Sequence, residues 1–271
     1  LFMTQKNRID QRFAALKSEG KSAFVAYICA GDPTMDRSLE IMFALERAGA
    51  DVIELGVPFS DPMADGIVNQ MAGHRALEAG ATTKGVLELI RRFRATSEIP
   101  IVIFTYLNPI YSYGFTRFHE DAAEAGADGI LLLDLPPEEA SLNKELTENS
   151  LLRHIRLIAP TTAKGRIPQL AATAEGFIYY VSREGVTGAQ TSLAEGIEKN
   201  VAGIKAHTGV PIVVGFGIST PEQAAAVAKI SDGVVVGSAI VRQIEQHGTS
   251  PDIASRIEAF VKPLVEATKS V

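Results

Sequence analysis

The sequence predicts one (β/α)8 barrel with an extra helix before its first strand. Three observations lead to this: short Val- and Ile-rich runs alternate with helical segments, one helix-to-strand junction recurs, and no linker divides the 271 residues. Runs that lack polar alternation are typical of parallel strands buried on both faces. Eight strand–helix units in a chain of about 250 residues fit a closed barrel. We therefore expect a single domain, residues 1–271.

The elements follow one another in a regular order. An amphipathic segment at 6–17, with Ile9, Phe13 and Leu16 on one face, predicts the extra helix. The predicted strands are residues 23–30, 52–57, 100–106, 129–134, 155–159, 177–182, 211–217 and 233–238. The predicted helices are residues 38–48, 83–94, 116–125, 137–149, 167–174, 194–207, 221–229 and 253–265.

The recurring junction is a helix stop, a glycine turn and an aspartate before a strand. Ala-Gly-Ala-Asp ends at Asp51 and again at Asp128, and a looser copy ends at Asp232. A repeated junction is what a cyclic β/α unit would produce. A doubly wound open sheet is the alternative, but Gly31-Asp32-Pro33-Thr34 after the first strand does not match its glycine fingerprint.

Composition narrows the class of partner. The net charge is -6, and Lys and Arg form no stripe, which argues against nucleic acid. No apolar stretch reaches the roughly 18–20 residues that span a bilayer, so we expect no membrane segment. The N-terminus reads as neither a signal nor a transit peptide, and the one cysteine, Cys29, lies in an apolar run. We expect a cytoplasmic protein without an internal disulfide.

Function in such a barrel lies at the carboxyl ends of the strands. Strand alternation places Val52, Glu54 and Gly56 on one face, and Glu54 then points into the barrel mouth. A buried carboxylate is costly, so Glu54 is either catalytic or a structural group with a partner. Asp65, before a glycine, is a turn residue or a second functional carboxylate, and Asp61 competes with it for that role.

Two glycine-rich turns follow the last two predicted strands, at 215–219 and 237–240. In barrels this pair of loops often binds phosphate through backbone N–H groups at a helix start. The ordinary interpretation of either turn alone is a tight turn. The polar segment 182–191 is a mobile lid or a plain surface loop.

Other chemistries lack their residues. The five histidines have no metal-ligand spacing, and we expect them on the surface or on helices. No lysine stands at a strand end for a Schiff base. Three tyrosines, Tyr27, Tyr106 and Tyr179, are either barrel core or the wall of a flat apolar pocket.

The stretch ELGVPFSDPMADG (54–66) closely resembles the signature of the tryptophan synthase alpha subunit family. The segments 31–33, 158–162, 182–188, 215–218 and 237–241 also resemble that family, in its order, so the resemblance covers essentially the whole chain. It implies a lyase of tryptophan biosynthesis that cleaves indole-3-glycerol phosphate to indole and glyceraldehyde 3-phosphate. It also implies an alpha2-beta2 complex with a beta subunit that holds pyridoxal phosphate, and no cofactor in this chain.

The resemblance also assigns residues. Glu54 matches the catalytic acid and base, Asp65 the aspartate that hydrogen-bonds the indole N–H, and Thr187 the lid threonine that contacts Asp65. The phosphate-binding positions are Gly188, Gly217, Gly237 and Ser238, and the indole-pocket positions are Tyr27, Phe104, Leu133 and Tyr179.

The chain departs from the family pattern after Gly66. Ile67 stands where proline is usual, and Asn69 replaces a common apolar residue, which puts the partner interface in doubt more than the chemistry. Tyr27 adds a hydroxyl where some members carry phenylalanine. Two alternatives remain at this point: another phosphate-binding barrel enzyme such as an isomerase, or a non-catalytic subunit that activates its partner.

Overall fold

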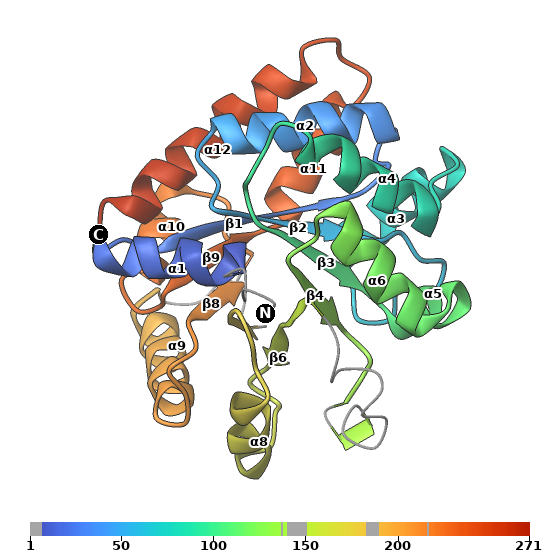
Figure 1. Ribbon diagram of the computed structural model, residues 1–271. Coiled ribbons are helices and arrows are strands. Elements are labelled where there is room, and N and C mark those ends of the chain that lie inside the picture. Colours follow the sequence, from blue (N-terminus) through green and yellow to red (C-terminus); the bar gives the residue numbers. More distant parts are fainter. Residues whose placement is uncertain (1–6, 137, 140–150, 183–189, 216) are drawn as a thin grey trace.

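The chain forms a barrel of parallel strands surrounded by helices (Figure 1). The computed structural model describes residues 7–136, 138–139, 151–182, 190–215 and 217–271. None of the helices in these ranges has the length and apolar character needed to cross a bilayer. The predicted helix at 137–149 lies almost wholly outside them.

Nine strands make one parallel sheet, in the order β5-β4-β3-β2-β1-β9-β8-β7-β6. The strands are β1 (Ala23–Cys29), β2 (Val52–Gly56), β3 (Ile101–Thr105), β4 (Gly129–Leu132), β5 (Arg153–His154), β6 (Arg156–Ile158), β7 (Ile178–Val181), β8 (Ile212–Gly215) and β9 (Gly233–Val236).

The two edges of this sheet are halves of a single broken strand. β5 pairs with β4 and β6 pairs with β7, and only Ile155 separates β5 from β6. With β5 and β6 counted as one strand, the barrel has eight strands, as predicted. The prediction at 155–159 began two residues late, because Arg153 and His154 are polar and an apolar run does not reveal them.

The helices are α1 (Arg8–Ser18), α2 (Met35–Arg47), α3 (Ile67–Glu78), α4 (Thr83–Arg94), α5 (Leu107–Tyr113), α6 (Phe115–Ala125), α8 (Ile167–Ala172), α9 (Gln190–Lys205), α10 (Pro221–Ala228), α11 (Ser238–His247) and α12 (Ile253–Lys269). Helices α3, α5 and α11 were not predicted. The buried face of α3 holds only Ala72, Gly73 and Ala76, so it carries no apolar stripe that a sequence pattern would reveal.

Two apolar layers hold the barrel together. The larger one joins the outward faces of the strands to the helices and includes Ile53 and Leu55 of β2. The smaller one fills the barrel interior, where Val52 of β2 meets Ile9, Phe13 and Leu16 of α1. The predicted extra helix thus closes one end of the barrel, and the strand alternation predicted for β2 is confirmed.

The recurring aspartates are structural. Asp51 Oδ2 accepts the backbone N–H of Phe24 at 2.7 Å, and the Asp51 N–H donates back to the Phe24 carbonyl at 2.8 Å. Asp128 makes the same reciprocal pair with Ile101, and Asp232 with Ile212. Each aspartate therefore joins its own strand to the start of the preceding strand, which explains why the junction repeats.

An ion pair fixes α3 at the opposite, carboxyl end of the barrel. Arg75 of α3 donates two hydrogen bonds, of 2.9 and 2.8 Å, to the buried carboxylate of Asp32 after β1. Arg75 also donates to Glu245 of α11 at 3.1 Å. A bidentate Arg–carboxylate pair fixes orientation as well as distance. The last turn of α3 is thereby fixed beside the carboxyl end of β1.

Candidate active site

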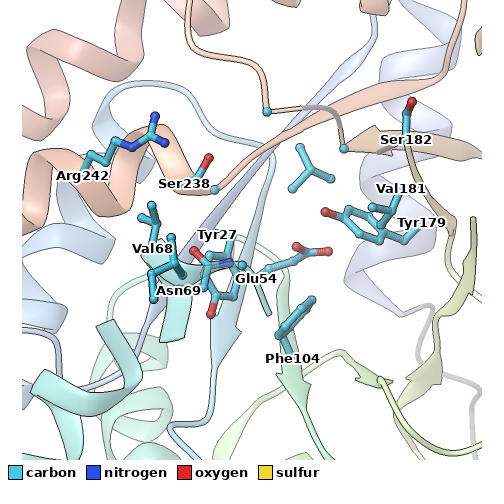
Figure 2. Close-up of a pocket in the computed structure, with 16 residues that line it drawn as sticks. Tyr27, Glu54, Val68, Asn69, Phe104, Tyr179, Val181, Ser182, Ser238 and Arg242 are labelled. Carbon is cyan, nitrogen blue, oxygen red and sulfur yellow. The ribbon is translucent and has the colours of Figure 1, made fainter. Parts of the chain in front are cut away.

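A cavity of about 400 Å³ opens at the carboxyl ends of the strands (Figure 2). Its wall combines three aromatic rings, one carboxyl group, several glycines and the start of α11. The described residues that line it are Tyr27, Glu54, Gly66, Ile67, Val68, Asn69, Phe104, Tyr179, Val181, Ser182, Gly215, Gly217, Val235, Gly237, Ser238 and Arg242. The cavity therefore lies at the end of the barrel where the sequence predicts the functional residues.

Glu54 carries the only carboxyl group among the described residues that line the cavity. Its side chain is fully buried, and neither carboxyl oxygen has a hydrogen-bond partner among the described residues. Burial disfavours the charged form and raises the pKa of Glu54 to about 8. The structural alternative requires a partner for this carboxyl group, and the described residues provide none. At neutral pH most of the Glu54 population carries a proton and faces the cavity, so it can act as an acid.

The aromatic wall surrounds Glu54. Tyr27 and Phe104 pack edge to face with ring centroids 5.0 Å apart, and Tyr179 comes from β7 (Figure 2). Burial raises the pKa of both tyrosine hydroxyls well above its ordinary value, with the charge of Glu54 adding to the effect. Both hydroxyls therefore stay neutral. Such a wall suits a flat aromatic ligand with a few polar atoms.

Asp65 lies beside the cavity, and the described lining residues do not include it. Its Oδ2 accepts a hydrogen bond of 2.9 Å from the Tyr106 hydroxyl, and the Asn69 side chain also donates to it. Burial raises the pKa of Asp65, and these two hydrogen bonds oppose the rise. The charge of Asp65 in turn raises the pKa of Tyr27 and Tyr179, which both line the cavity.

Asp61, the competitor, is exposed and accepts a hydrogen bond from its neighbour Ser60. Of the two aspartates in the loop, Asp65 is the one held by groups from another strand and helix. Tyr106, which follows β3, does not line the cavity, and its hydroxyl instead fixes this loop by accepting the Ala64 N–H at 2.9 Å.

The last two strands, β8 and β9, are followed by α10 and α11, and the N-termini of these two helices are capped differently. The start of α10 carries a capping box: Gln223 Oε1 accepts the N–H groups of Ser219 and Thr220, at 2.9 and 3.3 Å. The start of α11 has no side-chain cap. The first N–H groups of a helix have no partner within it, so α11, with Gly237 and Ser238 at the cavity, is the better anion site.

The remaining predicted positions divide into three sets. Gly217 lines the cavity with a φ of +65°, a conformation that favours glycine. Leu133 packs against the interior core and does not line the cavity. Thr187 and Gly188, with most of the proposed lid, lie outside the described residues.

Among the lining residues that the sequence did not assign to the site, two have polar side chains, Asn69 and Arg242. Asn69 was noted only as a departure from the family pattern, and Arg242 was not noted at all. Arg242 lies one helical turn after Ser238, so the i, i+4 spacing on α11 could have revealed it.

The histidines give no metal site. The described residues hold no group of three His, Cys, Asp or Glu side chains suited to a metal ion. The expectation that histidines are on the surface or on helices was wrong for His154, which is buried in β5 and stacks on the buried His119 of α6 at 5.6 Å.

Comparison with known proteins decides between the remaining families. The model of the family described as "Tryptophan synthase alpha chain" matches residues 13–269. The chain belongs to this family. The tryptophan synthase alpha chain of Opitutus terrae is 48% identical over 264 residues, covering 97% of this chain and 99% of the relative. That of Geobacter sulfurreducens is 48% identical over 261 residues, with 96% and 98% covered.

Solved structures agree with the family. The crystal structure of tryptophan synthase subunit alpha from Legionella pneumophila superposes with a TM-score of 0.88, at 40% identity, covering 97% of this chain and 98% of that one. A chain of tryptophan synthase from M. tuberculosis superposes with a TM-score of 0.86 at 30% identity, covering 97% and 98%. The chain is the lyase subunit of tryptophan biosynthesis, built as a (β/α)8 (TIM) barrel.

Proposed function

We propose that Glu54 performs both proton transfers in the cleavage of indole-3-glycerol phosphate. The protonated carboxyl group gives its proton to indole C3, and the resulting carboxylate takes the proton of the glycerol hydroxyl. The bond between indole C3 and the glycerol carbon then breaks, its electron pair returns to the ring, and an aldehyde forms. The observation that carries this role is the buried, unpaired carboxyl group of Glu54, whose pKa is raised to about 8.

Asp65 stabilises the positive charge that develops on the ring when C3 is protonated. Tyr106 and Asn69 hold its carboxylate. This carboxylate lies near enough to the cavity to raise the pKa of Tyr27 and Tyr179. A fixed negative group in a site with little water stabilises developing positive charge effectively. Thr187 of the lid is proposed to contact Asp65, on the strength of the resemblance.

The phosphate group binds at the start of α11. Gly237 and Ser238 offer backbone N–H groups, Gly217 lines the same cavity, and Gly188 completes the proposed set. Arg242 adds the one positive side chain among the described residues that line the cavity. The indole ring then lies among Tyr27, Phe104 and Tyr179, within reach of Glu54. Leu133 stays a proposed pocket residue from the resemblance.

The proposed partner is a beta subunit that holds pyridoxal phosphate and receives indole, in an alpha2-beta2 complex. Large apolar side chains are exposed on the segments that follow β2 and β3: Met63 on the loop is 92% exposed, Ile67 on α3 is 69% exposed, and Tyr111 on α5 is 75% exposed. Exposed apolar groups of this size gathered near a site are typical of a docking surface. The proposed steps need no cofactor in this chain, and its cytoplasmic location stays a prediction.

An indole-release assay tests the proposal. Purified chain is mixed with indole-3-glycerol phosphate, with and without beta subunit, and indole and glyceraldehyde 3-phosphate are measured together. We expect equal amounts of the two products and faster release with the beta subunit. No release even with saturating beta subunit would favour the non-catalytic alternative, and turnover of a phosphorylated aminosugar would favour an isomerase.

A further inference from the structure

Two helices, α3 and α11, each supply part of the wall of the cavity that Glu54 faces. Val68 and Asn69 come from the first turn of α3, and Ser238 and Arg242 come from the N-terminal half of α11 (Figure 2). The two helices also pack against each other. The distance between them therefore sets how well one ligand contacts both parts of the wall.

The apolar contact between these helices is made of small side chains. α3 buries Ala72, Gly73 and Ala76. The two alanines share one apolar cluster with Cys29 of β1 and Val241 of α11. A face of alanine and glycine buries little apolar area and has no large side chains to fit into the grooves of a neighbour. Such a face fixes the position of α3 only weakly, so its placement depends on polar contacts as well.

Arg75 supplies such contacts from the last turn of α3. Its guanidinium donates two hydrogen bonds to the Asp32 carboxylate, and its Nη1 donates one of 3.1 Å to Glu245 of α11. Asp32 is buried and follows β1, the strand that carries Tyr27 into the cavity. The planar fork of an arginine fixes direction as well as distance. One side chain thus links α3 both to the carboxyl end of β1 and to α11.

We propose that Arg75 is a positioning residue for the reaction: by joining Asp32 and Glu245, it holds α3 and α11 at the separation that lets one substrate contact both helices. The inference rests on the proposed function, in which the phosphate binds at the start of α11 and the ring binds beside Tyr27, a member of the cluster on which α3 packs. Arg75 is not among the described residues that line the cavity. A ligand held at two ends gains affinity only when the two sites are the right distance apart.

Three ligands that undergo no cleavage separate this distance from the quality of each end. 3-(Indol-3-yl)propyl phosphate spans the cavity, whereas indole and propyl phosphate each occupy one end. Calorimetry gives the dissociation constant of each ligand for the parent protein and its variants, and steady-state indole release gives KM. A positioning role predicts a loss of affinity for the spanning ligand alone, whereas general damage to the fold weakens all three.

Arg75→Lys keeps a positive charge beside the buried Asp32 carboxylate, so this carboxylate is not left unpaired. A single ammonium group cannot keep the forked contact and also reach Glu245. We expect the dissociation constant of the spanning ligand, and KM, to rise about tenfold or more, while those of indole and propyl phosphate change by less than about twofold.

Glu245→Gln removes only the charge pair to α11. Glu245 is half exposed, so the fold does not depend on this carboxylate. We expect a rise of about threefold in the dissociation constant of the spanning ligand alone. Glu88→Gln is the matched control: Glu88 also accepts from an arginine Nη1 at 3.1 Å, but its partner Arg91 lies on the same helix, α4. All three dissociation constants should stay unaltered in this control.

Equal losses for all three ligands, or an unchanged affinity for the spanning ligand in either folded variant, would overturn the inference and make Arg75 a stabilising residue only. Circular dichroism verifies folding, and if Arg75→Lys does not fold, Glu245→Gln against Glu88→Gln decides. Indole release by the parent protein is measured in parallel. Absent release contradicts the proposed function, whereas normal release with either of those two patterns contradicts the positioning role alone.

Discussion

The Tyr106 hydroxyl donates a hydrogen bond of 2.9 Å to the Asp65 carboxylate and accepts one of 2.9 Å from the Ala64 N–H. One phenol thus holds both the loop backbone and its functional carboxylate. The Tyr106 ring is buried and packs on Phe59 with centroids 5.3 Å apart. This pairing joins the loop after β2 to the end of β3.

Removing that hydroxyl should loosen Asp65 without emptying the core. We expect Tyr106→Phe to lower kcat by about tenfold or more, since hydrogen bonds to charged groups contribute about 1.5–3 kcal/mol. Steady-state indole release measures the change. Tyr111→Phe, which changes an exposed tyrosine of α5, is the matched control and should leave kcat of the isolated chain unaltered. An unchanged kcat in Tyr106→Phe would show that Asp65 is positioned by other groups.

Glu54→Gln tests the proton transfers. The amide fills the same space but neither gives nor takes the proton, so kcat should fall by about 10²–10⁴-fold. Binding of 3-(indol-3-yl)propyl phosphate should stay within a few fold of the parent value, because this ligand undergoes no proton transfer. Near-normal turnover by Glu54→Gln would exclude Glu54 as the acid.

The raised pKa of Glu54 also predicts a pH-dependent stability. Between its ordinary value of 4.5 and about 8, the folded chain holds a proton that the unfolded chain has released. Glu54 therefore does not lower the free energy of unfolding below pH 4.5, and this free energy decreases as the pH rises from 4.5 to about 8. Glu54→Gln lacks this loss, so its Tm should gain roughly 5 °C on the parent between pH 5 and pH 9. A constant difference in Tm across that range would contradict the raised pKa.

Gly56 gives the Tyr27 ring its place in the cavity. A Cβ atom at Gly56 would lie 2.7 Å from the Tyr27 hydroxyl and 3.1 Å from the nearest ring carbons. Gly56→Ala should therefore displace Tyr27 and raise KM by about tenfold. Adding Tyr27→Phe removes the closest contact and should restore at least half of the lost affinity. Failure of the second change to restore KM would place the damage in the β2 backbone.

Arg242 tests the phosphate end of the cavity. Arg242→Gln removes the positive charge but keeps a long polar side chain, so we expect KM to rise about three- to tenfold with little change in kcat. The rise of KM with ionic strength should also become shallower, because screening acts on the lost attraction. Arg256→Gln, which changes an exposed arginine of α12 that pairs with Asp252, is the control. If Arg242→Gln has the same KM as the parent, the phosphate is bound by backbone N–H groups alone.

Local patterns were enough to predict most of the barrel. Continuous apolar runs located every strand except β5, because a parallel strand buried on both faces has no polar alternation to obscure it. The polar start of the fifth strand and the small-residue face of α3 were missed, since neither buries large apolar side chains. The recurring aspartates were predictive as markers of the junction, although their hydrogen bonds to the preceding strand appear only in three dimensions.

The sequence by itself determined the barrel, the family and the inward direction of Glu54, because these follow from periodicity along single strands and from one long motif. Only the tertiary structure decided what surrounds each functional group. It placed Asp65 beside the cavity under Tyr106, brought Asn69 and Arg242 into the wall, and set Leu133 against the interior core. These relations join side chains from different strands and helices, and chain closure, not local pattern, fixes their distances.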